Sequence, residues 1–524
     1  MRCSSCPPRR RWFFVASLCA TWCLMLLAPM APPAEAASSS RPNIVLVMAD
    51  DQGWGDMAYN GHPALKTPNF DLAAKECLRL DRFYAAAPVC SPTRASVMTG
   101  RHPNRMGVFK WGYPMRPQET TIAEALKQAG YVTAHFGKWH LGSVRNASPA
   151  HPGANGFDYW LSAPNFYDND AVLSLMGKAV QTQGESSIVA ADAAIEWMKQ
   201  QGQGEAPFLA VIWFGSPHSP HRAVEEDLQW YADSPKPLQH FYGEITGMDR
   251  AYGKIRAAIK SSASAENTIL WYCSDNGALP RVGSTGGHRG NKGNVYEGGL
   301  LVPAIVEWPA RIKAPRSSSV RCNTCDIYPT LLELVGVQVE KQAPLDGVSL
   351  VSLFDGELDA RPRGMGFWDY TAPGIGTPSA QWMGDLLKTQ QAGGDLEPHI
   401  SSQRAAELPN PPLPTDKWPG HAAWVEGDWK LHRIEPGAAN ANSAKNGAKG
   451  KAKQANAKQG QAKQGKGKGK GEARGVTWEL YNLASDAQEG RNLYDSQPEV
   501  AQRLAKDLES WLGSVANSLN GKDY

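Results

Sequence analysis

Four short apolar runs in the first half of the chain each end in polar residues. They cover residues 43–48, 131–136, 208–214 and 268–273, and the first is a continuous apolar stretch of the kind found in strands buried on both faces. Helical periodicity follows over residues 188–200 and 241–260. The repeated order of strand, polar residues and helix predicts an α/β fold with a large, mainly parallel sheet and helices on both faces.

Chemically active side chains follow these strands at the point where each strand ends. In an open α/β sheet, the loops at the carboxyl ends of the strands share one edge and hold the site. We therefore expect the following residues to converge there: Asp50, Asp51, Lys138, His140, His218, Asp275 and Asn276.

The pattern changes after about residue 355. Residues 371–420 are rich in Pro, Gly and Gln, residues 422–434 and 478–483 predict two antiparallel strands, and residues 498–515 predict a final amphipathic helix. We expect a catalytic domain over residues 41–355 and a smaller α+β subdomain over residues 356–524. The Lys-, Ala-, Gly- and Gln-rich tract at about 436–475 lacks residues able to build a core, which predicts a disordered insertion.

The N-terminus has the features of a targeting segment. Three arginines precede an apolar stretch, and a small-residue, proline-rich exit ends near Ala37. This predicts a cleaved signal peptide over residues 1–37 and an exported protein, periplasmic or extracellular, with an uncleaved anchor as the alternative. No other stretch approaches the roughly 20 apolar residues of a spanning helix, so no membrane attachment is expected after cleavage.

Cysteine usage and charge exclude several classes of protein. Four of the nine cysteines lie in the signal segment, and the remainder are too few for a disulfide scaffold. Cys322 and Cys325 have a CxxC spacing but no second pair, so a local disulfide or two buried thiols is expected rather than a zinc site. The formal net charge is only +3, and nine of the lysines lie inside the insertion. The rest of the chain therefore lacks a uniform basic surface, which argues against a nucleic-acid partner.

The segment 90–100 has the features of a reactive site. Cys90 lies just before a predicted helix start, where unpaired backbone N–H groups favour an anion, and Arg94 follows one turn later. The alternative for Cys90 is a small buried apolar residue. The neighbouring charge and helix start favour a nucleophile beside a negative group.

Oxygen ligands gather after two of the strands. Asp50, Asp51, Asp275 and Asn276 provide the carboxylate and amide oxygens that Ca²⁺ and Mg²⁺ prefer. Either pair alone would be explained by turn and N-cap roles. Both pairs together predict a hard-cation site.

The Cys-x-Pro-x-Arg segment followed by Thr99-Gly100 resembles the signature of type I, formylglycine-dependent sulfatases, which are arylsulfatase-like members of the alkaline phosphatase superfamily. The resemblance covers residues 41–355. It implies that a formylglycine-generating or other sulfatase-maturing enzyme converts Cys90 to formylglycine, whose hydrate attacks the ester and forms a sulfo-enzyme intermediate. It also implies that Ca²⁺, in preference to Mg²⁺, is bound by the oxygen set above together with the modified Cys90.

The same resemblance assigns the remaining roles. Lys138 and Lys292 match the lysines that hold the sulfate, and Arg94 matches the arginine that steadies the formylglycine. His218 matches the general acid and His140 the base that expels sulfate. Without the resemblance, each lysine would be taken for a solvated charge and each histidine for a structural side chain.

The sequence therefore predicts an exported sulfatase that releases sulfate from a sulfated small molecule or glycan, with a sulfated carbohydrate favoured by the resemblance. A phosphodiesterase or phosphonate hydrolase of the same superfamily is the alternative within the hydrolases. A catalytically inactive sulfatase-like binding protein is the alternative outside them. Loops that include residues 143–180 and 371–420 are expected to select the substrate.

Overall fold

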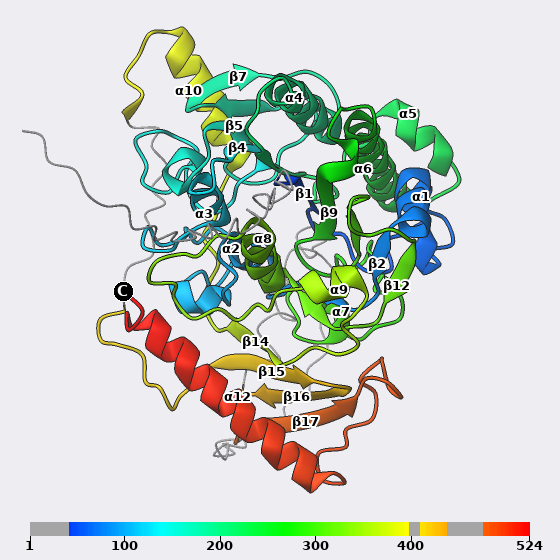
Figure 1. Cartoon of the computed structure of the whole chain (residues 1–524), viewed down its shortest axis with the longest axis vertical. Helices are drawn as coiled ribbons and strands as arrows, with labels where there is room; N and C mark the ends of the chain where they lie inside the picture. The colour runs from blue at the N-terminus through cyan, green and yellow to red at the C-terminus, as the bar shows by residue number, and fades with distance from the viewer. Residues whose placement is uncertain (1–40, 398–408, 437–474) are drawn as a thin grey trace, which may run out of the picture. The chain divides into compact units, whose positions relative to one another are not determined.

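The computed structural model describes residues 41–397, 409–436 and 475–524. A sheet of ten strands runs through these residues, with helices against both of its faces (Figure 1). In order across the sheet, the strands are β12 (Arg316–Ser318), β2 (Leu78–Leu80), β11 (Ala304–Glu307), β9 (Thr268–Ser274), β1 (Asn43–Ala49), β8 (Phe208–Trp213), β4 (Val132–Lys138), β5 (Tyr159–Ala163), β6 (Val172–Leu175) and β7 (Lys178–Gln181). The central strands from β9 to β5 are parallel, which confirms the predicted α/β fold.

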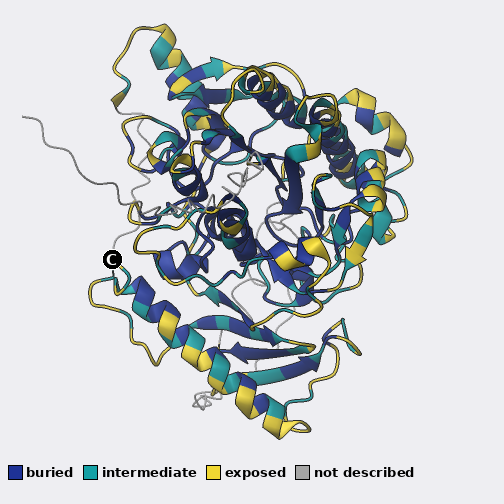
Figure 2. Ribbon diagram, viewed as in Figure 1, coloured by how far each residue is buried: buried dark blue, intermediate teal, exposed yellow. Residues whose placement is uncertain are grey.

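Two hydrophobic cores explain why β1 is apolar without interruption. Ile44, Leu46 and Met48 pack into the core shared with α2, α3 and α8, while the alternating residues between them pack into the core shared with α1, α4 and α6. Figure 2 shows the central strands as buried. The helices are α1 (Pro68–Glu76), α2 (Cys90–Thr99), α3 (Ile122–Lys127), α4 (Ser186–Gln201), α5 (Glu225–Leu228), α6 (Lys236–Lys260), α7 (Glu297–Leu300), α8 (Ile327–Val335) and α9 (Val351–Asp355).

A second, four-stranded antiparallel sheet forms the C-terminal part, in the order β14 (Met365–Tyr370), β15 (Gly420–Glu426), β16 (Trp429–Ile434) and β17 (Thr477–Asn482). One face packs against residues around β10 (Leu301–Val302), which forms a small sheet with β3 (Phe83–Tyr84) and β13 (Cys322–Asn323). The other face packs against α12 (Pro498–Leu519), the predicted amphipathic helix.

One C-terminal expectation was wrong, and one C-terminal element was not predicted. Residues 422–434 form two strands rather than one, because the chain turns at Gly427, whose φ of 55° suits glycine. The segment 371–420 contains a helix, α10 (Ser379–Gln391), that its weak periodicity did not predict. The predicted signal peptide and most of the predicted insertion lie outside the described residues.

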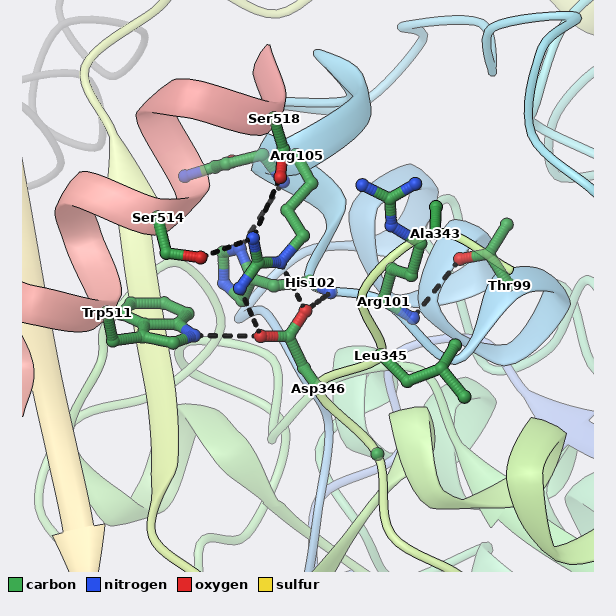
Figure 3. A network of polar contacts seen from close by, with 12 residues as sticks. Thr99, Arg101, His102, Arg105, Ala343, Leu345, Asp346, Trp511, Ser514 and Ser518 are labelled. Carbon is green, nitrogen blue, oxygen red and sulfur yellow. Dashed lines mark hydrogen bonds and ion pairs between the residues drawn. The ribbon is translucent and has the colours of Figure 1, made fainter. Parts of the chain in front are cut away.

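The C-terminal helix is fixed to the segment that follows α2. The Arg105 guanidinium, on the 3-10 helix η2 (Pro103–Met106), donates to both carboxylate oxygens of Asp346 at 2.7 and 2.9 Å and also to Ser514 and Ser518 of α12 (Figure 3). Trp511 Nε1 donates to the same carboxylate at 2.8 Å. This network joins α12, which packs on the four-stranded sheet, to the segment that follows α2.

Cys322 and Cys325 are buried free thiols, which matches one of the two expected states and excludes the local disulfide. Within the described ranges, no helix combines the length and apolar character needed to cross a bilayer.

Candidate active site

Four adjacent parallel strands, β9, β1, β8 and β4, end at the same edge of the large sheet. Their carboxyl ends bring together the residues that the strand order predicted. Asp50 and Asp51 follow β1, Asp275 and Asn276 follow β9, Lys138 ends β4 with His140 two residues later, and His218 follows β8.

Three carboxylates meet at this edge. One ligand atom from each of Asp50, Asp51, Cys90 and Asp275 lies within 4.8 Å of the others, and all four residues are buried. The backbone N–H of Asp51 donates to Asp275 Oδ1 at 3.0 Å. Asp51 takes a left-handed φ of 75°, which aspartate tolerates better than most residues. The left-handed turn and this hydrogen bond fix the carboxylates next to one another.

Cys90 is the first residue of α2 rather than the residue before it. Its Sγ lies 4.0 Å from Asp51 Oδ1, and Pro92 is tolerated because it sits in the first turn of the helix. Burial raises the pKa of Cys90 to about 12. The encoded thiol is therefore neutral near pH 7 and is a weak nucleophile.

Each carboxylate has a cationic partner. Lys138 Nζ lies 2.7 Å from Asp50 Oδ2, and Lys292 Nζ lies 2.5 Å from Asp51 Oδ1. Arg94 Nη2 lies 2.6 Å from Asp275 Oδ2. Lys292 comes from the glycine-rich loop before α7, so the structure brings it into the site together with the strand-end residues.

Burial and these cations move the carboxylate pKa values in opposite directions. Burial raises the pKa of Asp50 to about 7, against the opposing effect of Lys138. Burial alone would raise the pKa of Asp51, but Lys292, His218 and Lys138 together outweigh burial and hold that pKa well below its usual range. Asp51 is consequently a fixed negative charge at the centre of the site.

Arg94 makes contacts with residues from three strand ends that the sequence did not predict. Its guanidinium is fully buried, donates to Asp275 and to the Lys138 carbonyl, and lies 5.1 Å from the ring centroid of Trp213. The hydrogen bonds of Arg94 thus connect the ends of β9 and β4. Trp213 ends β8, and nothing in its apolar sequence context distinguished it from an ordinary core residue.

The two histidines differ in how they are held. His218 Nδ1 donates to the Ser219 carbonyl at 2.6 Å, which directs Nε2 to within 3.6 Å of Asp51 Oδ2, and its ring stacks on Phe166 at 4.6 Å. His140 has a left-handed φ of 56°, and neither ring nitrogen has a hydrogen-bond partner among the described residues. Phe166 was not identified from the sequence, because residues 143–180 have no readable pattern.

Burial also controls the protonation of both rings. It lowers the pKa of His218 to about 3 despite Asp51, and it lowers the pKa of His140 well below the usual value, with Lys138 adding to the effect. Both imidazoles are therefore neutral near pH 7, and His140 is available to accept a proton.

The donor set fits a hard cation. Asp50 Oδ1 and Asn276 Oδ1 are buried and have no hydrogen-bond partner among the described residues, so both have free lone pairs. Calcium–oxygen distances of about 2.3–2.6 Å require ligand atoms on opposite sides of the ion to lie about 5 Å apart, as the cluster allows. The residues present can hold such an ion.

The sequence of this chain resembles those of several known proteins. The protein-family model described as Sulfatase matches residues 42–337. The N-acetylgalactosamine-6-sulfatase of Canis lupus familiaris is 32% identical over 384 residues, which cover 65% of this chain and 71% of the relative. The arylsulfatase G of Rattus norvegicus is 32% identical over 384 residues, which cover 62% of this chain and 70% of the relative.

Solved structures share the fold. The crystal structure of Ps i-CgsB in complex with k-i-k-neocarrahexaose has a TM-score of 0.70 and 22% identity, covering 92% of this chain and 94% of that one. A structure in complex with D-glucosamine-2-N,6-O-disulfate has a TM-score of 0.62 and 18% identity, covering 92% and 99%. At these identities, the likeness extends to the arrangement of strands and helices.

Proposed function

Because this chain belongs to the sulfatase family and is a sulfuric ester hydrolase, we propose that it releases sulfate from a sulfated carbohydrate, using Cys90 in the form of formylglycine and a bound Ca²⁺. The observation that carries the proposal is the position of Cys90. It begins α2 among three buried carboxylates, with Lys138 and Lys292 beside them.

Formylglycine, formed from Cys90 by a sulfatase-maturing enzyme, supplies as its hydrate an oxygen nucleophile in place of a weakly nucleophilic thiol. Cys90 Sγ lies inside the cluster of ligand atoms, so an oxygen at the same position would also face the metal ligands. The helix N-terminus behind it favours negative charge at this point.

Asp50, Asp51, Asp275 and Asn276 would hold the calcium ion, which when bound supplies positive charge to the non-bridging oxygens of the sulfate. Ca²⁺ is proposed in preference to Mg²⁺ because the donors are mainly carboxylates offered by the protein itself. Mg²⁺ more often keeps several waters.

The two lysines would bind the sulfate group from the protein side. Lys138 and Lys292 each hold a carboxylate of the cluster, so their ammonium groups are fixed before substrate arrives. Fixed positive charge stabilises the charge that develops on the transferring group at little cost of reorganisation. Arg94 acts through its partners, because it holds both Asp275 and the Lys138 carbonyl.

The histidines would move the protons. His218 presents Nε2 to the site, and the negative charge of a bound sulfate ester would favour its protonated form, which can then protonate the leaving oxygen. His140 is neutral and has no hydrogen-bond partner among the described residues, so it can take a proton from the nucleophile's second hydroxyl.

The relatives favour a sugar as the substrate. One is named as a sulfatase of N-acetylgalactosamine 6-sulfate, and one structural neighbour was solved with a sulfated glucosamine. We also propose export through the signal segment over residues 1–37. N-terminal sequencing of the mature protein tests this, and a mature chain beginning at Met1 would contradict it.

Sulfate release tests the proposed activity. The protein, produced together with a sulfatase-maturing enzyme, is incubated with N-acetylgalactosamine 6-sulfate, glucosamine 2-N,6-O-disulfate, a carrageenan oligosaccharide and 4-nitrophenyl sulfate, and free sulfate is measured. We expect release from at least one of the sugars. A matched aryl phosphodiester is the control, and a strong preference for it would overturn the proposal.

A further inference from the structure

An exposed tryptophan is held rigidly in the loop between η2 and α3. Trp111 is 41% exposed. Its backbone is held in place, because its carbonyl accepts a hydrogen bond from the Ile375 N–H at 2.9 Å. Gly374 lies directly against the indole, because a Cβ added at Gly374 would come within 1.9 Å of Trp111 Cε2. Backbone at Gly374 therefore covers part of the ring, while 41% of the residue stays exposed.

The two residues that precede Trp111 are also fixed. Lys110 forms an ion pair with Asp369 of β14, and Phe109 stacks on Tyr370 with ring centroids 4.4 Å apart. The indole is thus presented by a loop whose position is set before any ligand binds. Such pre-organisation reduces the entropy lost on binding.

The contacts of this loop place it at the rim of the active site. On one side, the Gly112 N–H donates to Ser91 Oγ at 2.9 Å, and Ser91 follows Cys90 in α2. On the other side, the segment that covers Trp111 continues to Thr377, whose carbonyl accepts from Asn165 at 3.2 Å.

The next residue, Phe166, stacks on His218. The indole and its covering segment therefore connect the surroundings of Cys90 with those of His218, the residue proposed to protonate the leaving oxygen.

The chemistry of the rim differs from that of the site below it. The site consists of charged groups that suit a sulfate, whereas the rim presents the Trp111 indole and the side chain of Ile375, which is 37% exposed. An indole face suits the apolar C–H face of a sugar ring, and ligand sites combine such faces with a few polar groups.

We propose that Trp111 is a stacking platform for a sugar ring of the substrate, and that Gly374 sets the position of that platform. Trp111 is then a specificity-determining residue that favours sulfated oligosaccharides over compact sulfate esters. The inference rests on the proposed action on sulfated carbohydrates and adds to it the residues that recognise the sugar.

The test compares two substrates in four variants. For Trp111→Ala, we expect kcat/KM for the sulfated oligosaccharide to fall about tenfold more than kcat/KM for 4-nitrophenyl sulfate. Trp111→Tyr should recover most of the loss, because it keeps an aromatic face. Gly374→Ala should lower the same ratio, because its Cβ displaces the indole. Gly376→Ala is the matched control, since a Cβ there meets nothing within 4 Å and should change neither substrate.

Two results would overturn the inference. One is an unchanged kcat/KM for the oligosaccharide in Trp111→Ala. The other is an equal loss on both substrates, which would mean that Trp111 supports the site without contacting the sugar. A wild-type protein that releases sulfate from 4-nitrophenyl sulfate but from no sugar would instead contradict the proposed substrate class, and this is seen before any variant is made.

Discussion

Lys292 reaches the centre of the site from a loop 241 residues away from Asp51, and its ammonium contacts both oxygens of that carboxylate, at 2.5 and 2.6 Å. The lysine side chain is mostly buried. Burial alone would lower the pKa of Lys292, but Asp51 and the other acidic groups of the site together raise it. The pair therefore keeps a fixed positive charge where the sulfate is proposed to bind.

Removing this charge should impair turnover. For Lys292→Ala, we expect kcat to fall by roughly 10²–10³, the usual effect of losing one preorganised stabilising group in the transition state. Steady-state kinetics with the preferred sulfated sugar measures the effect. Lys506→Ala, an exposed lysine on α12, is the control and should leave kcat unchanged. A wild-type kcat in Lys292→Ala would remove this residue from the proposed machinery.

Removing calcium should lower both activity and stability. After dialysis against EGTA with Mg²⁺ left in excess, we expect activity to be lost and the thermal midpoint to fall, because a ligand at 100 times its Kd stabilises the folded state by about 2.7 kcal/mol. Added Ca²⁺ should restore both. Full activity in EGTA with Mg²⁺ present would contradict the choice of calcium.

Replacing His218 should affect poor leaving groups most. A sugar alkoxide needs a proton as it leaves, whereas 4-nitrophenolate departs readily without one. In His218→Ala, we expect kcat for the sugar sulfate to fall by about 10²–10⁴ and kcat for 4-nitrophenyl sulfate to fall much less. His221→Ala, where the ring contacts Glu244, is the comparison. Equal losses on both substrates would argue against His218 as the acid.

Stability should depend on pH through His102, which precedes η2 and is not one of the residues proposed to hold the metal. Both ring nitrogens face backbone N–H groups, of Asn104 and Trp368, and burial lowers the pKa of His102 to about 3. Because the unfolded chain binds the proton near pH 6.5 and the folded chain does not, the stability from this group is complete above pH 6.5. It is lost as the pH falls toward 3.

Between pH 7 and 5, the His102 contribution should lower the free energy of unfolding by about 2 kcal/mol. Denaturant unfolding at both pH values measures this free energy in the wild type and in His102→Asn. In the variant, the free energy of unfolding should change less between pH 7 and 5, by that amount. An identical difference in the two proteins would show that His102 is not the group responsible.

Much of the site could be predicted because strand ends and a specific motif are local features. Asp50, Asp51 and Asp275 follow apolar runs, and the order of those runs implies a shared edge. Lys292 came only from the family resemblance, since a lysine in a glycine-rich loop has no intrinsic signal. The structure nevertheless places it on Asp51.

Contacts between distant segments could not be predicted. The contacts of Trp111 with Gly374, and of Phe166 with His218, join segments without periodicity, and their side chains meet only after the sheet has formed. The hairpin turn at Gly427 did have a signal, since a glycine followed by Asp428 interrupts an otherwise continuous strand pattern. The helix α10 had none that outweighed its Pro- and Gly-rich surroundings.

The central claim is that Cys90 becomes the oxygen nucleophile of a sulfatase. Mass spectrometry of the peptide containing Cys90, from protein produced with a sulfatase-maturing enzyme, tests this most directly. We predict a mass about 18 Da below that of the cysteine peptide, the difference between a thiol and a formyl group on the nucleophilic side chain. An active protein in which this peptide carries only an unmodified thiol would contradict the account.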